Sequence, residues 1–155
     1  NTYTLTYTAG ANGSISGTTP QTVNYGGSGS QVTAVANTGY HFVNWTGDVG
    51  TVANVNAAST TITMNGSYAI TANFAINTYT LTYTAGAHGS ITGTSPQTVD
   101  YGASGTAVTA VPDTGYHFVN WSDGVLTATR TDTNITANLS ITAYSCSRRA
   151  MNARA

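Results

Sequence analysis

The sequence predicts an all-β protein made of two tandem copies of one small antiparallel module. Three observations favour this fold class. Thr and Ser fill 44 of the 155 positions and Lys and Glu are absent, so β-branched residues dominate and helix-stabilising charge pairs are missing. Tyr3, Leu5 and Tyr7 alternate with Thr, the period of a half-buried strand. The segment 1–11 returns letter for letter at 77–87, which reveals an internal repeat.

The repeat sets the expected domain boundaries. Residues 1–45 and 77–121 are identical at 36 of 45 positions, after which the copies diverge and the second becomes five residues shorter. Surface loops tolerate such changes in length, so we expect loops at about 46–59 and 122–132. The predicted organisation is a first module at 1–75, a second module at 77–144 and an atypical, Arg-rich tail at 145–155. The short connection between the copies predicts an end-to-end arrangement.

Within the first copy, strand signals recur at short intervals, each bounded by Gly, Asn or Pro. Seven short strands fit a small antiparallel all-β module, such as a small sandwich. The expected strands are Tyr3–Thr8, Ser14–Gly17, Gln21–Tyr25, Gln31–Val35, Tyr40–Trp45, Thr60–Met64 and Tyr68–Phe74.

Several of these segments carry a resemblance to a known family. The opening YTLTY, the segments 21–26 (QTVNYG) and 39–45 (GYHFVNW), and the closing 70–74 (ITANF) resemble the divergent InlB B-repeat over both copies. The resemblance implies a small β-rich, β-grasp-like repeat found in tandem in secreted and cell-surface proteins of bacteria and archaea, with no catalytic residue to carry over. The second copy departs at 144–146 (YSC), so we expect its closing strand to be incomplete.

Composition excludes several classes of protein. A formal net charge of −1 provides no basic surface for phosphates, so we expect no nucleic-acid partner. No run approaches about 18 apolar residues, so no membrane span is predicted. Cys146 is the single cysteine, which excludes an intramolecular disulfide framework.

Catalytic and metal-binding patterns are also missing. Asp48 is the single acid of the first copy, so an active site built on paired carboxylates cannot recur in both. His41 and His117 recur, but no Ser near either has the context of a nucleophile. Three His and one Cys at 41, 88, 117 and 146 lack metal-ligand spacing. We therefore expect no enzyme activity, no cofactor and no metal.

The aromatic segments allow two interpretations, a ligand-binding surface or part of the hydrophobic core. One alternative is an exposed stacking platform for sugar rings, made by Tyr40, His41, Trp45, Tyr116, His117 and Trp121. The other is that Trp45 and Trp121 are the chief core aromatics of their modules, because Tyr40 and Phe42 share an inward-facing strand parity. We expect core tryptophans, with His41 on the opposite face.

Sequons for N-glycosylation occur at Asn12, Asn44, Asn65, Asn120, Asn134 and Asn138. With 14 Asn and 28% Ser plus Thr, about four would arise from composition alone, so these six are weak candidates for glycan attachment.

The expected function is that of a structural repeat in an exported surface protein or extracellular filament: a spacer, stalk or polymer subunit. The alternative is a carbohydrate-binding adhesin module that uses the Trp45 and Trp121 segments. Strands at 3–8, 31–35, 79–84 and 107–111 carry no charge. If they lie at sheet edges they lack the usual protection against pairing, which predicts self-association by end-to-end contact or strand exchange. The other possible partners are further repeats of the same protein, or glycans.

Overall fold

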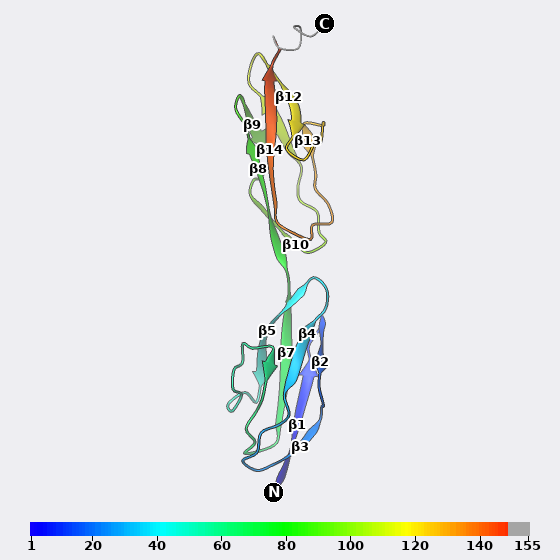
Figure 1. Cartoon of the computed structure of the whole chain (residues 1–155), viewed down its shortest axis with the longest axis vertical. Helices are drawn as coiled ribbons and strands as arrows, with labels where there is room; N and C mark the ends of the chain where they lie inside the picture. Colours follow the sequence, from blue (N-terminus) through cyan, green and yellow to red (C-terminus); the bar gives the residue numbers. More distant parts are fainter. Residues whose placement is uncertain (149–155) are drawn as a thin grey trace. The chain divides into compact units, whose positions relative to one another are not determined.

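The computed structural model describes residues 1–148 and divides the chain into two compact units after Asn77. We name them module 1 (1–77) and module 2 (from Thr78). Within residues 1–148, each module contains seven strands in the same order and neither contains a helix, so the all-β, tandem fold class is confirmed (Figure 1). Asn77 belongs to module 1, because its N–H donates to the Gly39 carbonyl at 2.8 Å.

The strands follow the sequence pattern closely in module 1. They are β1 (Thr2–Ala9), β2 (Gly13–Ser16), β3 (Gln21–Asn24), β4 (Val32–Ala36), β5 (Tyr40–Gly47), β6 (Ser59–Thr60) and β7 (Tyr68–Ile76). The sixth is shorter than the predicted 60–64, and only isolated bridges at Ile62 and Thr63 follow it.

Module 2 repeats this order. Its strands are β8 (Thr78–Ala85), β9 (Gly89–Thr92), β10 (Gln97–Asp100), β11 (Val108–Pro112), β12 (Tyr116–Trp121), β13 (Thr129–Arg130) and β14 (Leu139–Ser147).

Each module has a four-stranded sheet and a three-stranded sheet. In module 1 the orders are β3-β1-β7-β5 and β2-β4-β6; in module 2 they are β10-β8-β14-β12 and β9-β11-β13. The expectation of purely antiparallel modules fails at one pair in each, because β1 runs parallel to β7 and β8 runs parallel to β14. Parallel neighbours need a long crossover, and the three-stranded sheet lies within that crossover.

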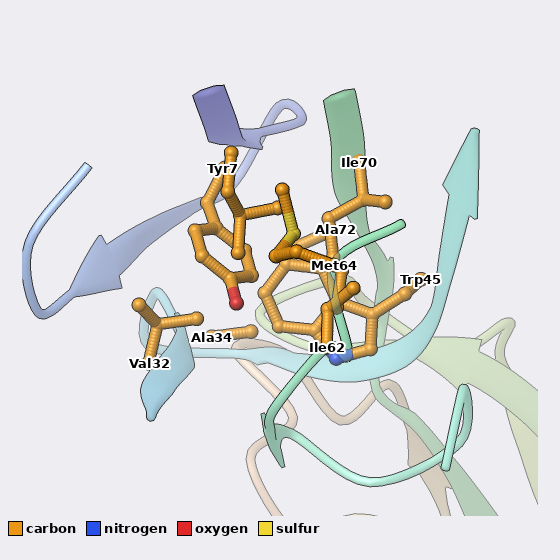
Figure 2. Packing of buried hydrophobic residues seen from close by; sticks show 9 residues of the cluster. Tyr7, Val32, Ala34, Trp45, Ile62, Met64, Ile70 and Ala72 are labelled. Carbon is orange, nitrogen blue, oxygen red and sulfur yellow. The ribbon is translucent and has the colours of Figure 1, made fainter. Parts of the chain in front are cut away.

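The core of each module is lined by the two parallel strands. Leu5 and Tyr7 of β1 are buried and alternate with exposed or half-buried Thr residues. Ile70 and Ala72 of β7 are buried and alternate with the exposed Ala69 and the half-buried Thr71 (Figure 2). The equivalent strands of module 2 bury Leu81, Tyr83, Ile141 and Ala143. Period-2 alternation thus places one face of the central strands in the core, as the sequence predicted.

A register shift in β5 brings Trp45 into this core. Tyr40 and Phe42 share one parity and Trp45 has the other, so simple alternation would place the indole on the opposite face. The pairing of β5 with β7 shifts between Phe42 and Asn44, and the same shift occurs between Phe118 and Asn120 in β12. An extra residue at that point reverses the phase, so Phe42 and Trp45 face the same core.

The closing strand of module 2 is complete, which corrects the expectation that it is not. β14 runs to Ser147 and pairs with both β8 and β12, so residues 145–147 belong to the strand and not to a tail. Ser145 replaces Phe74 opposite Phe118 without interrupting the ladder, because sheet hydrogen bonds are made by the backbone. Residues 149–155 of the expected tail lie outside the described residues.

The sheet edges differ from those expected. The uncharged segments 3–8, 31–35, 79–84 and 107–111 form β1, β4, β8 and β11, and all four are interior strands with a neighbour on each side. In module 1 the edge strands are β3 and β5 of the larger sheet and β2 and β6 of the smaller one. Among the described residues, no helix is long and apolar enough to cross a membrane.

Candidate functional site

The tryptophans lie in the cores of the two modules. Trp45 is 1% exposed and Trp121 is fully buried. The Trp45 indole packs against Tyr7, with ring centroids 5.8 Å apart (Figure 2). The Phe42 ring centroid lies 5.5 Å from that of Trp45. Its Nε1–H donates to the Ala57 carbonyl at 2.9 Å. Because the indole is buried and its N–H is bonded inside the module, it is not an exposed platform for sugar rings, and the expectation of core tryptophans is confirmed.

In module 2 the Trp121 indole N–H donates in the same way to the Thr127 carbonyl at 2.9 Å. Each tryptophan therefore ties the variable loop after its strand to the core. The two loops differ in length and sequence, yet the indole finds a backbone carbonyl in each. This explains how the loop tolerates a five-residue change while the preceding strand stays identical.

The remaining aromatic-segment candidates lie near the module surface. Exposed His41 is hydrogen-bonded through Nδ1 to Asn77 Oδ1 at 2.8 Å, and half-buried His117 has no partner for its Nδ1 among the described residues. Tyr116 stacks on His88 with centroids 4.1 Å apart. Tyr40 is half-buried. A ligand role for Tyr40, His41, Tyr116 and His117 stays a prediction.

Sequence reasoning missed a buried ionic cluster in module 2. Arg130 is 8% exposed and makes a two-pronged contact with Asp123, from Nη1 to Oδ1 at 3.0 Å and from Nη2 to Oδ2 at 2.8 Å. Its Nε and Nη2 also donate to Asp132 at 2.9 and 2.6 Å. The Tyr83 hydroxyl donates to Asp132 at 2.6 Å. The guanidinium carbon lies 5.2 Å from the Trp121 ring centroid, within the range of a cation–π contact.

The cluster shifts the pKa of each member in the direction that keeps the ion pairs charged. Hydrogen bonds from Arg130 lower the pKa of Asp123. Burial acts to raise the pKa of Asp132, but hydrogen bonds from Arg130 and Tyr83 outweigh it and the net pKa is lowered. Burial and the bond to Asp132 raise the pKa of Tyr83. The arrangement holds two carboxylates ionised around one guanidinium, which is a structural role and provides no free acid or base.

Module 1 has an apolar version of the same position. Val32 pairs with Thr60 where Val108 pairs with Arg130, so Thr60 is the counterpart of Arg130. Ile62 accepts a backbone hydrogen bond from Gly29 as Asp132 does from Gly105, and it is fully buried. The Tyr7 hydroxyl has no partner there. The signal available in the sequence was Arg130 itself, one of only four cationic residues in the chain. Its partners could not be identified from the sequence, because the two copies diverge in the loops that carry them.

Both modules match one known protein family. The family model described as the divergent InlB B-repeat domain matches residues 3–78 and again residues 79–144, almost the whole chain. The chain belongs to the divergent InlB B-repeat family. Both modules are B-repeats, and the resemblance noted in the sequence is confirmed. No curated protein and no solved structure matches the chain.

Family membership supports two general statements about these B-repeats. The family occurs in surface or exported bacterial proteins. Its repeats are generally non-catalytic. Within residues 1–148, no three His, Cys, Asp or Glu side chains are grouped so that they could hold a metal ion.

The sequon asparagines differ in their surroundings. Asn12 and Asn134 are exposed and have positive φ values of 68° and 52°, a conformation that Asn tolerates in turns. The other four use their side-chain amides within the B-repeat. They are Asn44, Asn65, Asn120 and Asn138. Glycan attachment at any of the six stays a prediction, and Asn12 and Asn134 are the positions where it would disturb the fold least.

Proposed function

We propose that this chain is a spacer or stalk segment of an exported surface protein. The observation that supports this most directly is the parallel pairing of the first and last strands of each module. Because parallel neighbours point the same way, the chain enters a module at one end of the sheet and leaves at the other. The register of module 1 separates Thr2 from Ile76 by about 11 residue steps, or roughly 36 Å at about 3.3 Å per step.

The proposed role needs no catalytic chemistry. In module 1 the sole acid, Asp48, accepts a hydrogen bond from the Ala69 N–H at 2.9 Å. In module 2 the buried carboxylates of Asp123 and Asp132 are paired with Arg130. An extracellular stalk without enzyme activity is therefore the simplest role for two closed cores in tandem.

Cell-surface exposure and reach test this proposal. Deleting residues 1–76 from the protein expressed in its host should leave module 2 folded and bring an epitope tag placed before the deletion closer to a tag placed after module 2 by up to about 36 Å. Immunogold labelling of intact cells measures both exposure and reach. Labelling only after permeabilisation would contradict the proposal. So would glycosidase, esterase or protease activity of the purified chain that disappears in the His41→Ala, His117→Ala double variant.

A second candidate role, as a self-associating polymer subunit, is favoured by a groove along β3. An open hollow of about 510 Å³ is lined by Pro20, Thr22, Asn24 and neighbouring polar residues of the loop 27–30. An equivalent hollow of about 410 Å³ lies along β10 in module 2. Tyr25 donates to the Asn1 carbonyl, so strand alternation turns the backbone groups of Thr22 and Asn24 outward. The Asn24 carbonyl accepts from the Gly27 N–H at 3.0 Å, which leaves the Thr22 backbone groups and the Asn24 N–H for another strand.

The partner that we propose for this edge is β3 of a second copy. An antiparallel pairing centred on Val23 places Thr22 opposite Asn24 of the partner and allows two backbone hydrogen bonds, each from an Asn24 N–H to the Thr22 carbonyl of the other copy. The chain already uses hydroxyl pairs across exposed antiparallel strands, as between Thr33 and Ser59 at 2.8 Å. In module 2 the residue equivalent to Asn24 is Asp100, and its charge guards β10 against the same pairing.

Sedimentation of matched variants tests the edge. Asn24→Asp places a carboxylate on β3, as Asp100 does on β10. We expect it to shift the self-association of the chain towards monomer, because the symmetric pairing would bring two carboxylates within about 8 Å of each other. Asp100→Asn should increase association by opening the second edge. A chain that remains monomeric at high concentration in the wild type and in Asp100→Asn would exclude this role while leaving the stalk untouched.

A further inference from the structure

We infer that each module is a mechanical clamp that bears tension along the chain through its two parallel terminal strands. In module 1 the clamp is the overlap of β1 with β7, which pairs five residues of each strand, from Leu5 with Tyr68 to Ala9 with Ala72 (Figure 1). In module 2 it is the overlap of β8 with β14, from Leu81 with Leu139 to Ala85 with Ala143. The inference rests on the proposed stalk role for its biological use, although the clamp is a property of each module alone.

The direction of the load decides how these hydrogen bonds break. Tension enters module 1 at Asn1, before β1, and leaves at Asn77, after β7. Because the strands are parallel, these points lie beyond opposite ends of the overlap, and tension draws the strands past each other along their length. All the hydrogen bonds of the overlap are then loaded together in shear. Strands pulled apart from one shared end would lose their bonds one at a time, at a lower force.

Core packing adds resistance to sliding. Leu5 and Tyr7 on β1 and Ile70 and Ala72 on β7 are each at most 3% exposed. A slip of one residue would turn these side chains towards solvent, and a slip of two would carry them past close-packed neighbours. The overlap therefore cannot slide without disrupting the core beneath it.

Both ends of the clamp are braced by edge strands. At the entrance, β1 pairs with β3 from Thr2 to Leu5, and Tyr25 N–H donates to the Asn1 carbonyl at 2.9 Å. At the exit, β7 pairs with β5, and Asn77 N–H donates to the Gly39 carbonyl at 2.8 Å. Arg148 N–H makes the same exit bond to Gly115 at 3.0 Å in module 2. The three-stranded sheet and the loop 48–58 lie outside this path.

Single-molecule stretching of the 155-residue chain tests the clamp, in a Cys146→Ser background so that engineered cysteines are the sole attachment points. Pulling from Asn1→Cys and from the C-terminus should give two unfolding events, each releasing roughly 20–25 nm at about 3.5 Å per residue. Forced unfolding reports the unfolding barrier, so the force measures the clamp directly.

A second attachment geometry provides the decisive control. Moving the C-terminal handle to Gly66→Cys places both handles at the same end of the overlap, so β1 is peeled from β7. A Cβ at Gly66 has no neighbour closer than 3.8 Å, so this variant folds. We expect the unfolding force of module 1 to fall at least twofold. Equal forces in the two geometries would overturn the clamp, and would leave the cell-surface test of the stalk unaffected.

Two matched core variants separate the clamp from overall stability. Ile70→Ala alters β7 within the overlap, and Ile62→Ala alters the core outside it; both isoleucines are at most 1% exposed. We expect both to lower the melting temperature of module 1 by several degrees, but only Ile70→Ala to lower its unfolding force markedly. An equal loss of force in both variants would show that the whole core, and not the strand overlap, resists tension.

Discussion

Arg130→Ala is expected to lower the free energy of unfolding of module 2 by about 3–5 kcal/mol, the cost of leaving buried charges without their partner. Arg130 satisfies Asp123 and Asp132 at once, and its removal leaves Asp132 with only the hydroxyl of Tyr83. Hydrogen exchange resolved by peptide measures the two modules separately. Protection should fall across module 2 and stay unchanged in module 1, whose equivalent residue is Thr60.

Module 1 supplies the rescue for this variant. Arg130→Thr combined with Asp132→Ile copies the residues of module 1 and removes the buried carboxylate together with its cation. Replacing a buried ion pair by apolar residues is often neutral or stabilising, so we expect stability to return to within about 1 kcal/mol of the wild type or to exceed it. A double variant as unstable as Arg130→Ala would show that the surrounding loop, and not charge pairing, depends on Arg130.

The same cluster makes module 2 sensitive to acid. The pKa values of Asp123 and Asp132 are lowered in the folded state, so the stability they contribute is present above the ordinary carboxyl value of 3.8 and is lost as the pH falls below it. We expect wild-type module 2 to lose protection below about pH 4. The Arg130→Thr, Asp132→Ile variant should lose less over the same range, and identical acid profiles would contradict this account.

Trp45→Ala and Trp121→Ala are expected to cost their modules about 3–5 kcal/mol each, enough to unfold a domain of this size. The indole of Trp45 fills the centre of the core among Tyr7, Ile62 and Met64 (Figure 2). It also satisfies the Ala57 carbonyl, so the variant loses both packing and the anchor of the loop. Urea unfolding followed by circular dichroism measures the loss, and each variant should unfold one module while the other stays native.

Trp45→Phe is the matched control, because it keeps an aromatic ring but loses the indole N–H. We expect an intermediate loss of stability and faster proteolysis within the loop 48–58. Near-native melting of both Trp→Ala variants together with loss of glycan binding would contradict the assignment of the tryptophans to the core, since that combination requires exposed indoles.

The sequence by itself determined the repeat, the strand pattern and the family. An identical segment of eleven residues in both copies indicates a duplication. The alternation of Tyr3, Leu5 and Tyr7 with Thr predicts a strand with one buried face. These features are local, because each depends on residues close in the chain or on direct comparison of two segments. The loops after Trp45 and Trp121 were predictable in part for the same reason, since the close match between the copies ends at these residues. The expected loop 122–132 also contains the short strand β13 (Thr129–Arg130), which the sequence did not indicate.

The tertiary structure alone decided which strands are neighbours, and three conclusions depended on it. Pairing of β1 with β7 joins residues more than 60 positions apart and makes β1 an interior strand, so the expected edge at 3–8 is closed on both sides. The shift after Phe42 turns Trp45 into the core against simple alternation. Arg130 meets Asp123 across a loop whose length and sequence differ from those of its counterpart in module 1. Alternation of apolar and polar residues specifies which face of a strand is buried. Backbone hydrogen bonds between strands depend little on the side chains, so alternation does not specify the partner strand. The packing of the whole module determines which strands pair.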